Sequence, residues 1–378
     1  MRIKVITFSR AQNYGAVLQT YALWRYLSNC GHDAELIDYI TERCAVNHPD
    51  FVEKRTRNSR FWGRSAILSH IWKLVYLKKE QEGHEHFFSF LRERVPMTHS
   101  YYSNEELKND CPEADLYITG SDQVWNTDFT WDHKIDLPYF MDFVPNGRFM
   151  ISYASSLGRD NIDFKAREDI YNHLKRYHAV SVRELSAQKM LNDIGIQAQT
   201  VLDPTFLCPV TEWGKLIQNI KKDKDYLLVF LIHPNKKLVK LSEELASRLN
   251  VNIKVIVSSM KNQKKLGFGA EWPKVLEWLE KLWNADFVIT DSFHATAFSL
   301  QFHKSFLVDG TVKYNTRISN ILERLELPSR SLNELKADTA EIILKQKINY
   351  VEVDNRLTLL IEESKKWLND QLEEAKIL

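Results

Sequence analysis

The chain has 378 residues, a length that accommodates two domains of ordinary size. Its formal net charge is +1, so no overall field indicates a nucleic-acid partner. The four cysteines are scattered without CxxC or Cys/His ligand spacing, which excludes the common zinc-binding patterns and favours reduced thiols in a cytoplasm. No stretch reaches about 18 uninterrupted apolar residues, so no membrane span is predicted, and the apolar run at the N-terminus is too short for a signal peptide.

The chain opens with the pattern of a strand, a loop, a helix and a second strand. Residues 3–9 read IKVITFS and predict a strand; a helix is predicted at about 16–29 and a strand at 35–39. The connecting loop contains Asn13 and Gly15. No GxGxxG follows the first strand, so the standard dinucleotide-binding fingerprint is absent.

Residues 53–94 depart from this alternation. They contain ten Lys or Arg residues, five Glu residues and interleaved aromatic residues, and they predict helices joined by polar loops. Two interpretations stay open. The segment is a helical excursion of the first domain with solvated charges, or it is a basic face for an anionic acceptor or a membrane surface.

Strand signals resume after this segment. The predicted strands are 115–119, 149–154, 179–182 and 200–202. A helix is predicted at about 164–177. Each apolar run stops at polar or small residues, which is the pattern of a parallel sheet whose loops build a site.

A domain boundary is predicted near 205–224, where two prolines precede a Lys-rich stretch. A second alternation then begins. Its predicted strands are 226–232, 253–258 and 286–291, and its predicted helices are 237–249, 272–284 and about 315–325. The sequence therefore predicts an N-terminal α/β domain over 1–208, a C-terminal α/β domain over 209–348, and an amphipathic helix over 349–378 that packs back on the domains.

The most informative stretch is 286–306, DFVITDSFHATAFSLQFHKSF. Its apolar strand ends in a polar turn that contains Ser292 and His294, and a helix pattern follows. Ligands of open α/β sheets bind at this edge, near helix N-termini, so His294 is the first candidate for proton transfer or anion binding. The alternative is a histidine that only caps the helix. His303 lies half a turn away on the helix, which makes a poor metal pair, and no metal site is predicted.

Cationic residues supply the next candidates. Arg183 follows the strand 179–182, where a guanidinium fork suits a carboxylate or phosphate; the alternative is a salt bridge with Glu184. Arg317 opens a predicted helix and is a second candidate. Lys304 adds positive charge to the site or is an exposed lysine after a helix.

The remaining candidates lie after two N-terminal strands. Gly15 lets the backbone approach an anion at the helix start, beside Asn13, although a plain tight turn explains both residues. Asp122 is a candidate base or a helix cap. Trp125 is a candidate stacking platform or a buried packing residue. The polar residues after strand 115–119 are Ser121, Asp122 and Gln123.

The motifs NYGAVLQTYAL, GSDQVWN, YASSLG, SVRE, LDPTFL and DSFHATAFSLQFHKSF occur in that order over roughly 1–330. In this respect the chain resembles the polysaccharide pyruvyl transferase family. The resemblance implies an α/β fold of two Rossmann-like domains facing a cleft, similar to the GT-B type of glycosyltransferase. It also implies transfer of a pyruvyl group from phosphoenolpyruvate to a polysaccharide or lipid-linked sugar, with no other cofactor. The chain has Ala295 and Ser305 where the family often has Gly and Pro.

The resemblance and the strand-end positions together give the expected site. The catalytic set is His294, Arg183 and Asp122, the donor-binding set is Asn13, Gly15, Ser121, Ser292, Lys304 and Arg317, and the acceptor-binding set is Gln123 and Trp125. Two rival functions remain, a sugar-nucleotide-dependent glycosyltransferase of the same architecture and a non-catalytic glycan-binding protein. A cytoplasmic location is expected, with 53–94 as the candidate contact to the inner face of a membrane.

Overall fold

The computed structural model describes residues 1–57, 59–130, 132–159, 161–162, 164–217, 225–266, 269–310, 316–332, 334 and 336–377. The chain divides into two compact units. Unit 1 comprises Met1–Val201 and Trp367–Leu378, and unit 2 comprises Leu202–Lys366. The division falls at Leu202, seven residues before the start of the second domain expected from the sequence, and the C-terminal helix contributes residues to both units.

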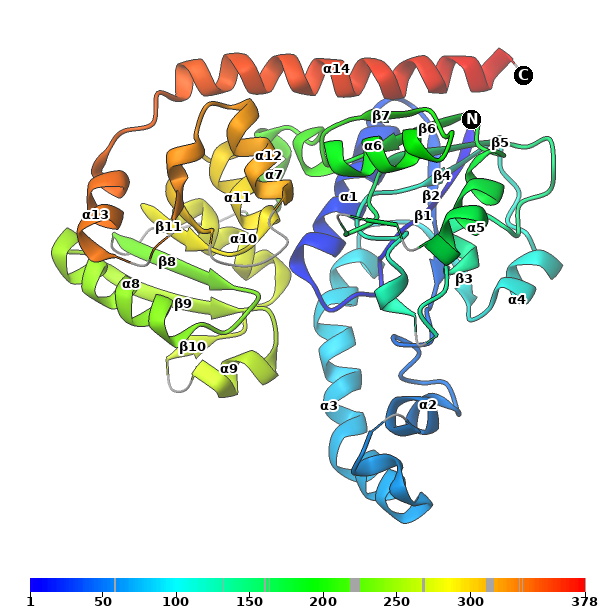
Figure 1. The fold of residues 1–378 in the computed structure, drawn as a ribbon, viewed down its shortest axis with the longest axis horizontal. Helices are drawn as coiled ribbons and strands as arrows, with labels where there is room; N and C mark the ends of the chain where they lie inside the picture. The colour runs from blue at the N-terminus through cyan, green and yellow to red at the C-terminus, as the bar shows by residue number, and fades with distance from the viewer. Residues whose placement is uncertain are drawn as a thin grey trace. The chain divides into compact units, whose positions relative to one another are not determined.

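Unit 1 is built on a parallel sheet of seven strands in the order β3-β2-β1-β4-β5-β6-β7 (Figure 1). The strands are β1 (Arg2–Ile6), β2 (Asp33–Tyr39), β3 (Met97–Tyr101), β4 (Leu116–Thr119), β5 (Phe149–Ser155), β6 (Ala179–Val182) and β7 (Ala198–Thr200). The central strands β4 and β5 are buried along their whole length, as expected for parallel strands covered on both faces. Their carboxyl ends therefore meet at one edge of the sheet.

Helices cover the sheet of unit 1 and extend from it. The helices are α1 (Tyr14–Asn29), α2 (Phe51–Arg57), α3 (Ala66–Arg92), α4 (Asn104–Asn109), α5 (Phe164–Leu174) and α6 (Leu185–Asp193), with the short 3-10 helices η1 (Trp62–Arg64), η2 (Thr127–Phe129) and η3 (Leu137–Phe140). Helix α1 is buried over most of its length. In Figure 1 the far end of α3, with α2, extends away from the sheet, so the helices predicted for 53–94 form such an excursion.

Unit 2 repeats the architecture with a parallel six-stranded sheet, β10-β9-β8-β11-β12-β13. Its strands are β8 (Tyr226–Leu231), β9 (Asn252–Val257), β10 (Ala270–Glu271), β11 (Phe287–Thr290), β12 (Ser305–Asp309) and β13 (Ser331–Leu332). Its helices are η4 (Pro204–Phe206), α7 (Val210–Leu216), α8 (Lys236–Leu249), α9 (Met260–Leu266), α10 (Val275–Asn284), α11 (Phe293–Gln301), α12 (Thr316–Arg324), η5 (Pro328–Arg330) and α13 (Ala337–Lys345). Helix α14 (Tyr350–Ile377) ends the chain.

The helix that follows β11 is buried from its first residue. Every residue of α11 is buried, and Phe298 packs edge-to-face against both Trp213 and Trp278. Aromatic contacts of this geometry stabilise a core beyond the burial of area alone. The core therefore fixes the helix whose first turn contains His294.

The last helix supports both units through separate contacts. Within unit 2, Ser364 on α14 accepts a hydrogen bond at Oγ from the backbone N–H of Leu202, 2.9 Å away. Within unit 1, the Tyr26 hydroxyl donates to Asn369 at 2.9 Å, and the rings of Trp367 and Tyr153 lie 6.2 Å apart. Residues of α14 thus contact each unit separately.

The observed elements follow the predicted ones closely, with informative differences. The first strand ends at Ile6, three residues earlier than predicted, because Ser9 already lies in the loop before α1. The strand predicted at 200–202 is displaced to Ala198–Thr200. Strand β3 was missed because its sequence, MTHSY, has no apolar run. The start of the helix predicted at about 315 lies outside the described residues.

Candidate functional site

The carboxyl edge of the unit 1 sheet has an unusual backbone at two places. Asp122, just after β4, has φ 79°, and Ala154 at the end of β5 has φ 54°. The left-handed region is disfavoured for residues other than glycine. The pairing of β5 with β6 shifts register between Ser152 and Ser155, and such bulges are frequent beside active sites because they re-aim side chains.

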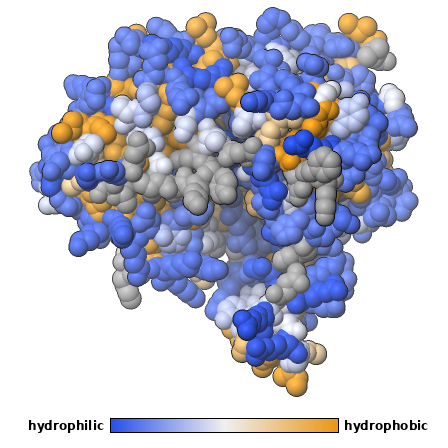
Figure 2. All heavy atoms as spheres, in the orientation of Figure 1, coloured by the Kyte–Doolittle hydropathy of each residue, from blue (hydrophilic) through white to orange (hydrophobic). Residues whose placement is uncertain are grey.

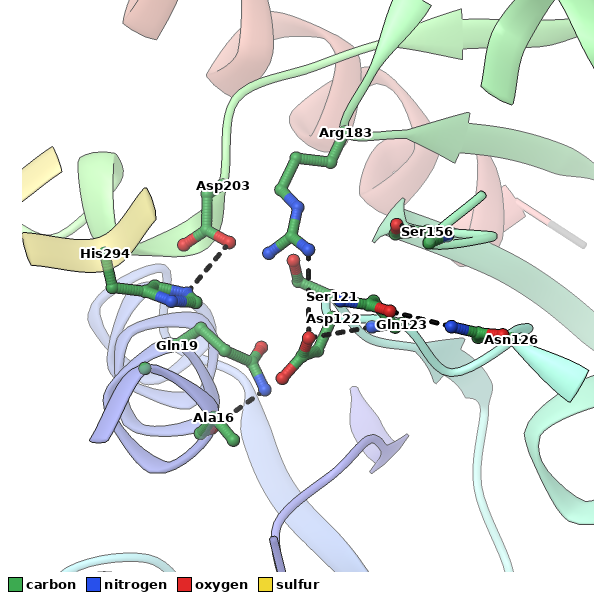
Figure 3. Close-up of polar contacts among 12 residues, drawn as sticks. Ala16, Gln19, Ser121, Asp122, Gln123, Asn126, Ser156, Arg183, Asp203 and His294 are labelled. Atoms are coloured by element: carbon green, nitrogen blue, oxygen red, sulfur yellow. Dashed lines mark hydrogen bonds and ion pairs between the residues drawn. The ribbon is translucent and has the colours of Figure 1, made fainter. Parts of the chain in front are cut away.

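Arg183 lies at this edge, directly after β6. Its side chain is 2% exposed, its Nη2 lies 3.7 Å from Asp122 Oδ1, and its Nε lies 3.8 Å from Glu184 Oε2 (Figure 3). These separations are ion-pair distances, longer than hydrogen bonds. The salt-bridge alternative is therefore present in this structure, with Asp122 as a second carboxylate. A ligand anion would compete with two carboxylates for this guanidinium.

Two loops of unit 1 fit together around Gly158. The Oε1 atom of Gln123 accepts a hydrogen bond of 2.8 Å from Asn126 Nδ2. Gly158 has φ +64°, and a Cβ there would lie 2.1 Å from the same Oε1 atom. Only glycine fits this close approach. The motifs GSDQVWN and YASSLG thus meet in space, and Gln123 lies at their contact.

Trp125 lies in the core of unit 1. Its side chain is 2% exposed, its Nε1 donates a 3.1 Å hydrogen bond to the Tyr139 carbonyl, and its ring stacks on Phe140 at 5.6 Å. This is the packing alternative weighed above. A buried indole with its N–H already bonded offers no open face to a sugar.

The start of α1 contains predicted and unpredicted candidates. Asn13 is the N-cap, and its Oδ1 accepts from the Gly15 N–H at 2.8 Å, so both residues build the helix start. Ser121, which follows β4, has its carbonyl oxygen occupied, because that oxygen accepts a 2.6 Å hydrogen bond from Thr7 Oγ1.

Gln19 on α1 was not singled out from the sequence. It is completely buried, and in the described chain its Oε1 atom has no hydrogen-bond partner. A buried, unsatisfied amide is costly unless a ligand or water completes it.

In unit 2, His294 is the second residue of α11 and is 7% exposed. Its Nε2 lies 3.6 Å from Asp203 Oδ2 (Figure 3). The N-cap of α11 is Ser292, whose side chain accepts from the Ala295 N–H at 3.3 Å. The cap role therefore belongs to Ser292. A carboxylate beside an imidazole can fix the orientation of the ring.

Asp203 is a site residue that the sequence analysis did not assign. Its Oδ1 accepts hydrogen bonds from the backbone N–H and the hydroxyl of Thr205, at 3.0 and 2.8 Å, which leaves Oδ2 directed at His294. The side chain is fully buried. The available signal was the Asp-Pro pair after an apolar run in LDPTFL. Asp203 is therefore held rigidly by its own turn.

A second histidine of unit 2 was also missed. His233 follows β8, and its Nδ1 lies 3.0 Å from Oδ2 of the buried Asp291. Hydrogen bonding to Asp291 raises the pKa of His233. Strand β8 neighbours β11 in the sheet, so His233 lies at the same edge as the DSFH turn. With its ring largely exposed, it can present a positive charge to a ligand.

The two predicted cationic residues of unit 2 differ in their surroundings. The Arg317 guanidinium lies 6.0 Å from the ring centre of Phe293, the neighbour of His294, so it lies beside the candidate site. The Lys304 ammonium donates to the Trp283 carbonyl in the last turn of α10. That contact satisfies a helix C-terminus, which is a structural role.

In the part of the chain that the structure describes, no three His, Cys, Asp or Glu residues are arranged to hold a metal ion. His303 instead pairs with Asp354 at 3.0 Å. The absence of a metal requirement stays a prediction.

Among the described helices, none is long and apolar enough to cross a membrane.

Comparison with known proteins identifies one family. The family model described as polysaccharide pyruvyl transferase matches residues 13–308, a range that contains all the site residues above except Arg317. No curated protein matches the sequence.

Solved structures give the fold. A putative UDP-N-acetylglucosamine 2-epimerase from Listeria monocytogenes has a TM-score of 0.58 at 9% identity, over 99% of this chain and 97% of that one. The enzyme from Rickettsia bellii has a TM-score of 0.56 at 11% identity, over 100% and 97%. The enzyme from Neisseria meningitidis, bound to UDP-GlcNAc, has a TM-score of 0.52 at 11% identity, over 99% and 100%. The fold is thus the α/β, GT-B-like one expected from the sequence.

Proposed function

This chain belongs to the polysaccharide pyruvyl transferase family, and from that premise we propose that it moves a pyruvyl group from phosphoenolpyruvate to a sugar of a polysaccharide or lipid-linked glycan. The product is a pyruvate ketal, and inorganic phosphate is released. The observation that carries the proposal is His294, which lies in the last motif of the family match with the buried carboxylate of Asp203 3.6 Å away.

The proposed reaction needs one proton delivered and two removed. Protonation of the donor methylene carbon makes the adjacent carbon an oxocarbenium-like centre. A sugar hydroxyl attacks this carbon and loses its proton, the bond to the phosphate oxygen breaks, and a second hydroxyl closes the ketal and loses its proton. The chain must therefore supply an acid, a base and positive charge for the leaving phosphate.

The residues of each unit suit parts of this chemistry. We assign proton transfer to His294, positioned by Asp203. His233 and Arg317 are candidates for binding donor phosphate in unit 2, because His233 carries a raised pKa and a largely exposed ring. In unit 1 we retain Arg183 for a carboxylate or phosphate and Asp122 as the candidate base. The family match supports the proposed reaction. The role given to each residue is argued from the chemistry of its side chain and from its neighbours.

The main alternative is a sugar-nucleotide-dependent glycosyltransferase of the same architecture. The comparison structures include a protein bound to UDP-GlcNAc, but at 11% identity the likeness concerns the fold alone. The second alternative is a glycan-binding protein without catalysis. Both are distinguished by ligand response, because a ligand that binds only the folded state raises the unfolding midpoint.

A thermal-shift screen tests the donor assignment. The purified chain is melted with phosphoenolpyruvate, inorganic phosphate, UDP-GlcNAc or 2-phosphoglycerate, which carries carboxylate and phosphate but no enol. We expect phosphoenolpyruvate to raise the midpoint most. A response to UDP-GlcNAc with none to phosphoenolpyruvate would support the glycosyltransferase, and no response to either would leave the non-catalytic protein as the better account.

A further inference from the structure

The helical excursion of unit 1 contains a long stretch of one charge sign. Residues 54–79 contain eight Lys or Arg residues and no Asp or Glu. In the described part of the chain, Lys54 pairs with Glu42 and Arg55 with Glu80, both outside the stretch, and Lys78 reaches Glu82 at 4.0 Å. The other basic residues of the stretch are Arg57, Arg60, Arg64, Lys73 and Lys79, and no ion pair of theirs occurs among the described residues. The stretch therefore presents a net positive surface.

One side of α3 in this excursion is packed. Trp72 is 7% exposed and forms a small core with Phe51 of α2. The ring of Tyr76 lies 5.8 Å from the rings of both Trp72 and Trp62. The hydroxyls of Thr56 and Ser69 hydrogen bond at 2.9 Å. Helices α2, η1 and the first half of α3 thus form a small folded element with its own core.

The opposite side of α3 is apolar and uncovered. Ile67, Ile71, Leu74 and Val75 are 73%, 41%, 72% and 45% exposed. Their spacing of i, i+4, i+7 and i+8 places them on one stripe of about 100°. Phe61, just before η1, is 53% exposed. Figure 2 shows apolar residues beside strongly hydrophilic ones at the end of the helical excursion.

We propose that the end of this excursion, with the apolar stripe of α3, Phe61 and the basic residues of 54–79, binds the surface of an anionic membrane. Apolar side chains enter the boundary between headgroups and acyl chains, and Lys and Arg contact anionic headgroups, as in other interfacial amphipathic helices. Lys78 lies in line with the stripe and is 85% exposed, so it can extend to the headgroups while the stripe is buried.

Charge favours this occupant over a second copy of the chain. In a symmetric dimer through this face, each copy would present the same surface to the other, so the net positive charge of 54–79 would meet an equal positive charge. Juxtaposed like charges oppose association, whereas an anionic lipid surface neutralises them. Membrane binding goes beyond the proposed reaction and does not depend on it. It would bring the protein to acceptors that are anchored in lipid.

The test is sedimentation of the full chain with vesicles of phosphatidylcholine alone or with phosphatidylglycerol. We expect binding only to the anionic vesicles, with a decrease as salt is raised. The variant Ile67→Gln/Leu74→Gln removes the two most exposed apolar residues of the stripe. The variant Arg57→Gln/Arg60→Gln/Arg64→Gln/Lys73→Gln removes four charges. Each should lower the partition coefficient by about tenfold or more.

Matched controls carry the same changes elsewhere. Ile342→Gln/Val351→Gln replaces side chains that are 69% and 72% exposed in unit 2. Lys237→Gln/Lys240→Gln/Lys264→Gln/Lys347→Gln removes four exposed lysines of unit 2. Both should bind like the wild type. Equal binding of all variants overturns the proposal, as does strong binding to neutral vesicles. A wild-type dimer in light scattering that the stripe variant abolishes would assign the face to a second copy and also overturn it.

Discussion

At the residue scale, the proposed proton transfer depends on His294. Replacement by Ala should lower turnover by about a hundredfold or more, a typical loss for a general acid or base. Folding should change little, since Ser292 and the core around Phe298 fix α11. Steady-state kinetics and a thermal melt measure the two effects.

The partner residue gives this assignment a second test. Asp203→Asn keeps the hydrogen bonds to Thr205 but removes the charge 3.6 Å from His294. It should lower kcat, because the imidazole loses the charged partner that positions its ring. His99→Ala, which alters an exposed histidine of β3, is the control. A His294→Ala variant with near-normal turnover would remove this residue from the mechanism.

Arg183 differs from His294 because two carboxylates already flank it. Arg183→Lys should mainly weaken donor binding, seen as a raised KM with a smaller change in kcat, since lysine cannot present a planar fork. Its loss of contact with Asp122 and Glu184 should also lower stability, because those carboxylates are buried or nearly so. A loss of stability with an unchanged KM would assign Arg183 to structure alone.

At the element scale, a partly buried pair joins strand β2 to the start of η3. The Tyr39 hydroxyl donates to Asp136 Oδ1 at 2.8 Å, in the wall of a pocket of about 380 Å³. Burial raises the pKa of Asp136 to about 6. The folded state then holds this proton more tightly than the unfolded state does. The free energy of unfolding therefore falls as pH rises from about 4 through 6, and ionised Asp136 costs stability above that range.

Asp136→Asn should consequently stabilise the protein more at pH 8 than at pH 5, by on the order of 1 kcal/mol in the difference. The amide keeps an oxygen for the Tyr39 hydroxyl but cannot ionise. Urea unfolding at the two pH values measures the effect, and Asp132→Asn, an exposed neighbour, is the control. The same gain at both pH values, or no gain, would contradict the burial of this carboxyl group.

The elements also explain what sequence reasoning could reach. Strands such as β5 and β8 are wholly buried, so their apolar runs and polar ends were visible without structure. Strand β13 has two residues, and β3 has a mostly polar sequence. Neither strand therefore shows the apolar pattern from which a strand is predicted. Ser292 and His294 could be assigned to one turn because they are near neighbours along the chain.

At the scale of the whole molecule, the missing information was pairing between distant segments. Asp203 and His294 are 91 residues apart in the sequence, and His233 and Asp291 are 58 residues apart. A parallel fold commonly brings such distant residues together. Neither pairing has a local sequence signal. Trp125 illustrates the opposite mistake, in which a core residue is taken for a site residue. A prominent aromatic residue in a motif can belong to the hydrophobic core. The family and the two-unit fold were predictable because six motifs kept their order.

The central claim concerns the donor, and phosphate release tests it most directly. The chain is incubated in EDTA with phosphoenolpyruvate and a panel of glycan and lipid-linked sugar acceptors, with wild type, His294→Ala and His99→Ala side by side. We predict inorganic phosphate and an equal amount of pyruvylated sugar from wild type and His99→Ala, with an acceptor in the panel, and about a hundredfold less from His294→Ala. Phosphoenolpyruvate left intact while a nucleotide sugar is consumed would contradict the account.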